Sequence, residues 1–115
     1  MNTLIEREQM KFVINNRTFD TDTSQTVAIS RGARTPENPW DDDFPAQSVR
    51  YENVLYRTAK GALFVHYHKT MKFDRGKPVV DDSAQEVTPE EAISWIQMNL
   101  AAVIDPTGLT LPPEA

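Results

Sequence analysis

The chain has 115 residues, a formal net charge of −5 and no cysteine. Its length suits one domain with a single hydrophobic core, and without cysteine that core receives no help from disulfides or thiolate-bound zinc. A negative chain has little general affinity for phosphate backbones, and no segment approaches the ~20 consecutive apolar residues that span a bilayer. We therefore expect a cytoplasmic protein that neither enters membranes nor binds nucleic acid directly.

The predicted domain extends over residues 10–104, between tails at 1–9 and 105–115. Its first segment, KFVINNRTFD, alternates like two short strands on either side of Asn15 and Asn16, and asparagine tolerates the positive φ of a tight hairpin turn. The next segment, DTDTSQTVAIS, is rich in threonine. Its apolar residues 27–29 favour a short strand over one turn of helix.

A long loop is predicted at residues 31–47, RGARTPENPWDDDFPAQ, because its prolines and successive aspartates stop both helices and strands. Connections of this length are uncommon in a compact domain and are often functional. The loop carries Trp40 and Phe44 beside three aspartates. The size of the two rings favours packing against the body of the domain over display to a partner.

A second hairpin is predicted from Val49 to Lys72, with its reversal at Lys60-Gly61. Its two runs alternate between apolar and polar residues, as strands with one buried face do. The segment DRGKPVVDDSAQE that follows is interpreted as a polar loop containing at most a brief strand at Val79-Val80.

A helix is predicted to begin after Thr88, because Thr88 suits the N-cap, Pro89 the first helical position and Glu91 the capping box. Its apolar stripe should lie on the sheet. The stripe consists of Ile93, Ile96 and Leu100.

These elements predict an α+β fold, in which a mainly antiparallel sheet of four or five strands carries one C-terminal helix packed on one face. The predicted core consists of Phe12, Ile14, Phe19, Val27, Ile29, Leu55, Leu63, Val65, Ile93, Ile96 and Leu100. Trp95 and Met98 lie on the other side of the helix, where they would form the edge of the core or, if exposed, a surface for self-association as a homodimer.

His66 and His68 are two residues apart on a predicted strand, so their side chains leave the same face and could approach one metal ion. A third ligand would have to come from Asp74, Asp81 or Asp82. Because a bare H-x-H is a weak signal, the sequence favours two half-exposed histidines, and no cofactor is predicted. A metal-binding domain remains an alternative.

No nucleophile elbow or phosphate-binding loop is found in the sequence, and both histidines lie on one predicted strand. The sequence therefore predicts a protein without enzymatic activity. A nucleic-acid-binding sheet is a further alternative, which the overall charge disfavours. It would use Arg50, Arg57, Lys60, Lys69 and Lys72.

Acidic residues cluster in two places, and solvated loop charge is the simplest interpretation of both. The alternative is a patch that docks on a basic surface of a protein partner, since complementary charge speeds and orients association. The predicted contact residues are Trp40, Asp41, Asp42, Asp43, Phe44, Asp81 and Asp82. On this hypothesis, serine at positions 41–43 weakens capture of the partner in a pull-down without lowering thermal stability.

Three segments carry a resemblance to known proteins: KFVINNRTFDT, LYRTAKGALFVH and TPEEAISWIQMNL. With its YRT-x-KG hairpin and capped C-terminal helix, the chain resembles a group of small, mostly uncharacterised bacterial proteins carried by phages and plasmids. Accessory proteins of mobile genetic elements often disable host machinery, as anti-CRISPR proteins do. The resemblance thus implies a protein-binding inhibitor of a host defence complex, with a CRISPR-Cas component as the expected partner.

Overall fold

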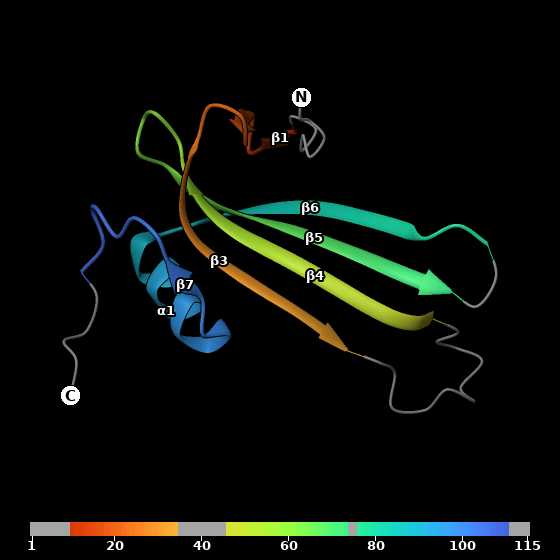
Figure 1. Ribbon diagram of the computed structural model, residues 1–115. Coiled ribbons are helices and arrows are strands. Elements are labelled where there is room, and N and C mark those ends of the chain that lie inside the picture. The colour runs from red at the N-terminus through yellow and green to blue at the C-terminus, as the bar shows by residue number, and fades with distance from the viewer. Residues whose placement is uncertain (1–9, 35–45, 74–75, 111–115) are drawn as a thin grey trace, which may run out of the picture.

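The computed structural model describes residues 10–34, 46–73 and 76–110, and these form an α+β fold (Figure 1). Five strands make one antiparallel sheet in the order β6-β5-β4-β3-β7, and β1 pairs with β2 in a small sheet of its own. This confirms the predicted class and the antiparallel sheet. The strands are β1 (Lys11–Ile14), β2 (Arg17–Asp20), β3 (Gln25–Arg34), β4 (Ala46–Arg57), β5 (Leu63–Phe73), β6 (Val79–Val87) and β7 (Ala102–Val103), and the helix is α1 (Pro89–Asn99).

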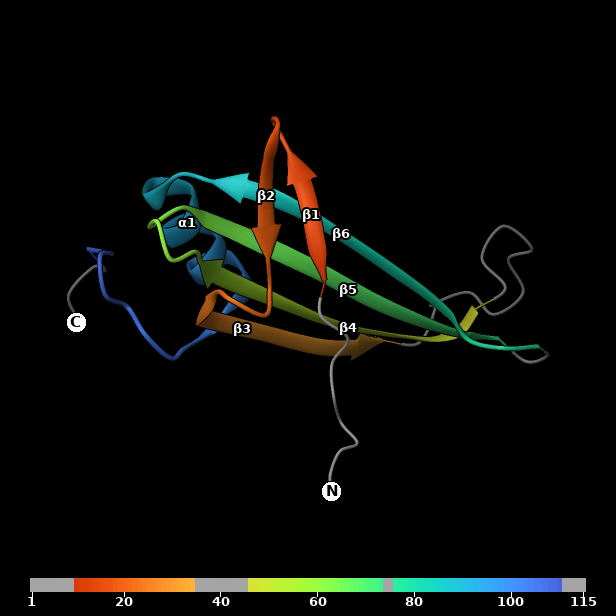
Figure 2. The same cartoon turned by 90° about the horizontal axis from the view of Figure 1, so that it is seen from above.

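The β1–β2 hairpin turns at Asn15 and Asn16, as predicted. Their φ angles are 52° and 63°, which is the left-handed conformation that a two-residue hairpin turn needs and that asparagine tolerates. The hairpin crosses over one face of the large sheet, while α1 lies on the other side (Figures 1 and 2). It therefore covers a face that the sequence interpretation had left open.

Strand β3 is longer than predicted and continues to Arg34, while β4 already begins at Ala46. Both ends of the predicted 31–47 loop are therefore strand. Gly32 sits opposite Tyr51 in this pairing, and a Cβ atom at Gly32 would lie 2.2 Å from the Tyr51 hydroxyl oxygen. Glycine is therefore required at this position by the close approach of a tyrosine side chain.

The β4–β5 turn confirms the predicted reversal at Lys60-Gly61. Gly61 has a φ of 91°, and its N–H donates to the Thr58 carbonyl oxygen over 2.9 Å. The polar loop predicted after β5 is wrong, because residues 79–87 form β6. Among the strands that the structure describes, β6 pairs with β5 alone and is an edge strand, so backbone pairing forms it although its sequence is largely polar.

The start of α1 is as predicted. The Thr88 side chain accepts from the Glu91 N–H, the Glu91 side chain accepts from the Thr88 N–H, and Pro89 occupies the first turn. The end differs from the prediction, since Leu100 is the C-cap in the left-handed conformation and 90% exposed. The apolar stripe therefore ends at Ile96, and Leu100 is not a core residue.

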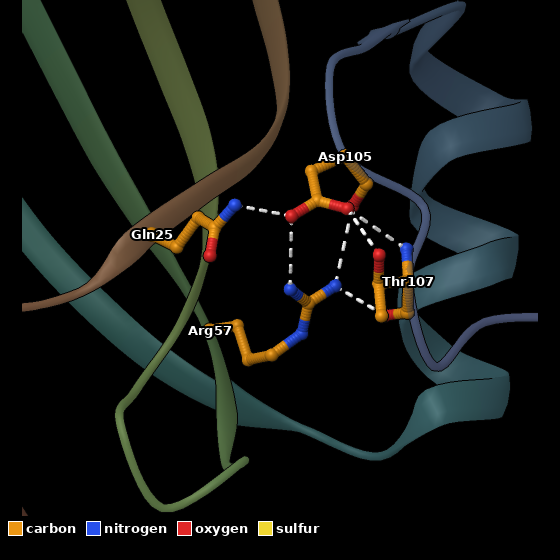
Figure 3. Close-up of polar contacts among 4 residues, drawn as sticks. All are labelled: Gln25, Arg57, Asp105 and Thr107. Atoms are coloured by element: carbon orange, nitrogen blue, oxygen red, sulfur yellow. Dashed lines mark hydrogen bonds and ion pairs between the residues drawn. The ribbon is translucent and has the colours of Figure 1, made fainter.

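The described residues after the helix include 105–110 of the predicted tail at 105–115. Ala102 and Val103 pair with β3 as strand β7. Asp105 then accepts hydrogen bonds from Gln25 and Arg57, and the Arg57 guanidinium also donates to the Thr107 carbonyl oxygen (Figure 3). The predicted tail at 1–9 and residues 111–115 lie outside the described residues.

Two buried clusters share the sheet. The first holds Val27, Ala28, Leu55, Leu63, Val65, Ala92 and Ile96. The second, beneath the hairpin, holds Phe19, Val54, Tyr56 and Phe64, with Phe12, Ile14 and Ile29 half-buried against it. Alternate residues of β4 and β5 thus enter opposite clusters, because successive side chains of a strand point to opposite faces.

Six residues of the predicted core are buried, and six further buried residues were not predicted. Buried as predicted are Phe19, Val27, Leu55, Leu63, Val65 and Ile96. Missed were Ala28, Val49, Val54, Tyr56, Phe64 and Ala92. A β-bulge between Thr26 and Ala28 explains why the neighbours Val27 and Ala28 enter one cluster, since a bulge re-aims successive side chains.

Candidate metal centre

Both histidines of the chain lie on β5, and an aspartate of the neighbouring strand lies beside them. In the pairing of β5 with β6, His68 is directly opposite Asp82, and His66 is opposite Ala84. His66 and His68 are two residues apart and therefore share one face. The hairpin covers that face, since the Phe12 ring lies 5.2 Å from the His66 ring.

One carboxylate oxygen joins the two imidazoles. His66 Nε2 lies 2.8 Å from Asp82 Oδ1, and His68 Nδ1 lies 2.7 Å from the same oxygen. An ionised carboxylate only accepts hydrogen bonds. In this arrangement His66 Nε2 and His68 Nδ1 are therefore the donors to Asp82. One ligand atom from each of the three residues lies within 4.8 Å of the other two.

The environment of Asp82 acts on its carboxyl in two opposing ways. Burial alone raises the pKa of Asp82, because it disfavours the charged form. Hydrogen bonds from His68 and His66, together with their charge interactions, outweigh burial and hold the pKa below its ordinary value. The carboxylate is therefore ionised at neutral pH, which is the form that binds a cation.

The three side chains are placed differently relative to solvent. The His66 side chain is 12% exposed, that of Asp82 is 18% exposed and that of His68 is 38% exposed. On its far side, His68 Nε2 lies 3.5 Å from the Thr70 hydroxyl oxygen. That hydroxyl can accept from Nε2 when Nδ1 is a metal ligand, which is the outer-shell support that ligating histidines usually have.

The group opens into a pocket of about 410 Å³ between the hairpin and the sheet. The pocket is lined by Met10, Thr21, Glu52, Val54, Tyr56, His66, His68, Val80 and Asp82. Glu52 is directly opposite His68 on β4, and its carboxylate is paired with the Arg31 guanidinium at 2.7 Å. An ion bound by the three side chains would thus face a cavity rather than be enclosed.

The donor set fits a divalent transition metal. Imidazole nitrogen and carboxylate oxygen suit zinc, iron, nickel and copper, whereas magnesium and calcium prefer oxygen alone. Two histidines and one carboxylate leave at least one coordination position, which is the pattern of zinc sites that keep a water or a substrate. In the part of the chain that the structure describes, this is the one group of three potential ligands.

The other predicted contact residues do not gather at this site. Trp40, Asp41, Asp42, Asp43 and Phe44 lie outside the described residues. Asp81 is exposed and is opposite Lys69, so it belongs to the other face of the sheet from Asp82. The two acids that the sequence grouped into one patch are therefore separated by the alternation of β6.

Trp95 and Met98 have different surroundings. Trp95 is half-buried against the first cluster, as the edge-of-core interpretation predicts. Met98 is 84% exposed. Self-association through these two side chains stays a prediction.

The basic residues of the nucleic-acid alternative are also divided. Arg57 is bound to Asp105 and Thr107, and Lys69 shares its face, whereas Arg50 and Lys72 lie on the opposite face by the alternation of β4 and β5. No single basic surface results from this set.

Within residues 10–34, 46–73 and 76–110, no helix has the length and apolar character needed to cross a bilayer.

Comparison with known proteins gives no relative: no family model, curated protein or solved structure matches the chain. The resemblance to proteins of mobile elements therefore stays a prediction.

The sequence identified the two histidines and included Asp82 among three candidate acids. It could not choose among them, because the choice depends on the register of β5 against β6, and β6 had been interpreted as a loop. Met10 and Thr21, which flank the hairpin, and the lining residues of β4 were missed for a related reason. The pocket forms only where the hairpin crosses the sheet, and no local pattern encodes that crossing.

Proposed function

We propose that this protein binds one divalent transition-metal ion through His66, His68 and Asp82. The observation that carries the proposal is the convergence of two imidazole nitrogens on one carboxylate oxygen, at 2.8 and 2.7 Å. Metal-ligating side chains must be held together before the ion arrives if affinity is to be high, because ordering them costs free energy. Here the pairing of two adjacent strands holds them.

Binding requires a rearrangement of hydrogens rather than of strands. The hydrogens that His66 Nε2 and His68 Nδ1 now donate to Asp82 must move to the other ring nitrogens or be released. A neutral imidazole then offers each lone pair to the ion. Asp82 contributes one negative charge, so a divalent ion at this site keeps a net charge of about +1.

Calorimetric titration of the full chain with Zn²⁺ and Co²⁺ tests the proposal. We expect one ion per chain, and we expect alanine at His66 or His68, or Asp82→Asn, to weaken binding by more than the ~10–100-fold that loss of an outer-shell partner costs. Asp81→Asn is the matched control, because it removes a neighbouring carboxylate of the same strand from the opposite face. The control should bind like the parent.

Equal affinity of the Asp81 and Asp82 variants would contradict the site, and so would binding that exceeds one ion per chain and survives loss of both histidines. Circular dichroism of each variant checks that it is folded. Histidine at the surface can bind metal weakly without a built site, so the comparison of Asp81 with Asp82 decides between the two cases.

The protein-binding module predicted from the sequence remains a second proposal, with an inhibitor of a host defence complex as its specific form and the cytoplasm as its location. Its support is the acidic, aromatic composition of residues 40–44. Of its other contact residues, Asp81 is exposed, whereas Asp82 is engaged by the histidines. Both proposals take α1 as packed on one face of the sheet, which the presence of Ala92 and Ile96 in the first cluster supports.

A further inference from the structure

We propose that the metal-loaded site takes a small organic monoanion, with its carboxylate on the ion and its apolar body in the pocket between hairpin and sheet. This inference rests on the proposed metal site and names the ligand class that such a site would accept. Three features carry it: the open coordination position, the charge around the ion and the apolar wall of the pocket.

The open position follows from the number of protein ligands. His66, His68 and Asp82 supply three donor atoms, and zinc or cobalt in such a site takes at least a fourth ligand. The three side chains themselves line the pocket, so the fourth ligand would come from the pocket. A carboxylate oxygen is an ordinary ligand for these ions, and it would displace a bound water.

The charge around the site favours one negative charge on the ligand. A divalent ion with Asp82 and two neutral imidazoles has a net charge of about +1. The nearest other carboxylate that lines the pocket, that of Glu52, is paired with Arg31 at 2.7 Å. A monoanion would therefore complete a neutral site, whereas a dianion would leave an excess charge in a partly buried pocket.

The pocket wall favours an apolar body. Val54 is 2% exposed and Tyr56 is 6% exposed, so both belong to the second buried cluster and form a firm floor. Val80 on the edge strand is 54% exposed and lines the same pocket with Met10. Covering such side chains with an apolar ligand is favourable by the area removed from water.

Visible absorption of the Co²⁺-loaded full chain, titrated with sodium benzoate, tests the inference. Replacement of cobalt-bound water by a carboxylate changes the ligand-field bands, so we expect a saturable spectral change. Benzamide, which has the same ring without the charge, should give none. Val80→Ser should weaken benzoate binding about fourfold for each methylene-sized group that no longer packs on the ring, whereas Val79→Ser, on the opposite face of the same strand, should not.

The outcomes separate this inference from the metal site itself. Failure to bind Co²⁺ overturns both proposals. Stoichiometric Co²⁺ binding with a spectrum that benzoate does not alter overturns the anion site alone. Equal responses to benzoate and benzamide overturn the charge argument, and equal effects of the Val79 and Val80 substitutions place the ligand outside this pocket.

Discussion

Asp105 is a single carboxylate that ties the chain after α1 to two strands of the sheet. It accepts from Gln25 on β3 and from Arg57 on β4, and its other oxygen accepts from the backbone N–H of Thr107 at 3.1 Å (Figure 3). The Thr107 hydroxyl also donates to it. Arg57 completes the contact by donating to the carbonyl oxygens of Asp105 and Thr107.

These contacts make a prediction about acid stability. Hydrogen bonds from Thr107 and the nearby Arg57 charge hold the pKa of Asp105 below its ordinary value. A carboxyl whose folded pKa is lowered stabilises the fold above its unfolded pKa of about 3.9, and this contribution is lost as the pH falls through the folded pKa. We therefore expect Asp105→Asn to lower stability at neutral pH and to flatten the loss of stability below about pH 4.

Urea denaturation of both proteins between neutral pH and the acid limb measures this difference. Asp22→Asn is the control for removing one negative charge, because Asp22 lies exposed in the turn after β2. Parallel stability curves for the parent and Asp105→Asn across the acid range would show that the carboxylate contributes nothing that depends on its charge.

At the residue scale, the sequence predicted what depends on neighbours along the chain. The capping box of Thr88 and Glu91 and the left-handed turn at Asn15 and Asn16 are encoded within four residues, and both are confirmed. Asp82 is different, because its role depends on the pairing of two strands. Asp82 follows two valines and an aspartate and precedes a serine. Nothing in these neighbours indicates that it contacts two histidines.

At the element scale, the predicted types were more accurate than the predicted ends. β6 was missed because its sequence, VVDDSAQEV, lacks the apolar alternation of a strand with one buried face. No residue of β6 is fully buried, and its side chains are exposed or half-buried along the whole strand. Backbone pairing with β5 forms β6. Because this pairing needs no particular side-chain pattern, the sequence signal for such an edge strand is weak.

The end of α1 allows a prediction at this scale. Leu100 adopts a φ of 50° and is 90% exposed, so its side chain gains little burial while its Cβ opposes the left-handed conformation. Leu100→Gly should therefore stabilise the protein by about 1 kcal/mol. Leu100→Ala keeps the Cβ atom and should give no such gain.

Chemical denaturation of the parent and the two Leu100 variants measures the difference. A glycine variant no more stable than the alanine variant would mean that the Leu100 side chain, and not the backbone, decides stability at this cap. A shortened helix in the glycine variant, visible as reduced ellipticity, would point to the same conclusion.

At the scale of the whole molecule, the large sheet has buried side chains on both faces. The sequence suggested one buried face, so it placed Leu55, Leu63 and Val65 correctly and missed Val54, Tyr56 and Phe64 of the opposite face. The signal was present, since β4 and β5 are apolar on both faces near the KG turn, in NVLYR and ALFVH. Such a run indicates a strand buried on both sides.

The hairpin that covers the second face also forms one wall of the candidate metal centre. Phe12 points inward to the His66 ring at 5.2 Å, whereas its neighbour Val13 points away and is 76% exposed. Met10, which precedes β1, and Thr21, which follows β2, line the pocket, and the Thr21 N–H donates to the Met10 carbonyl oxygen over 2.9 Å. The contact between Phe12 and His66 thus belongs both to the docking of the hairpin and to the candidate metal centre.

This arrangement predicts that metal binding and hairpin docking stabilise one another. Phe12→Ala should lower the free energy of unfolding by about 1–3 kcal/mol, as loss of a half-buried ring does, while Val13→Ala stays within ~0.5 kcal/mol. Hydrogen exchange of the hairpin amides should slow when Zn²⁺ is added to the parent. Because coupling between two binding events is reciprocal, Zn²⁺ that favours the docked hairpin must bind the docked form more tightly, so Phe12→Ala should also weaken Zn²⁺ binding. Unaltered Zn²⁺ affinity in Phe12→Ala would show that the hairpin covers the site without positioning it.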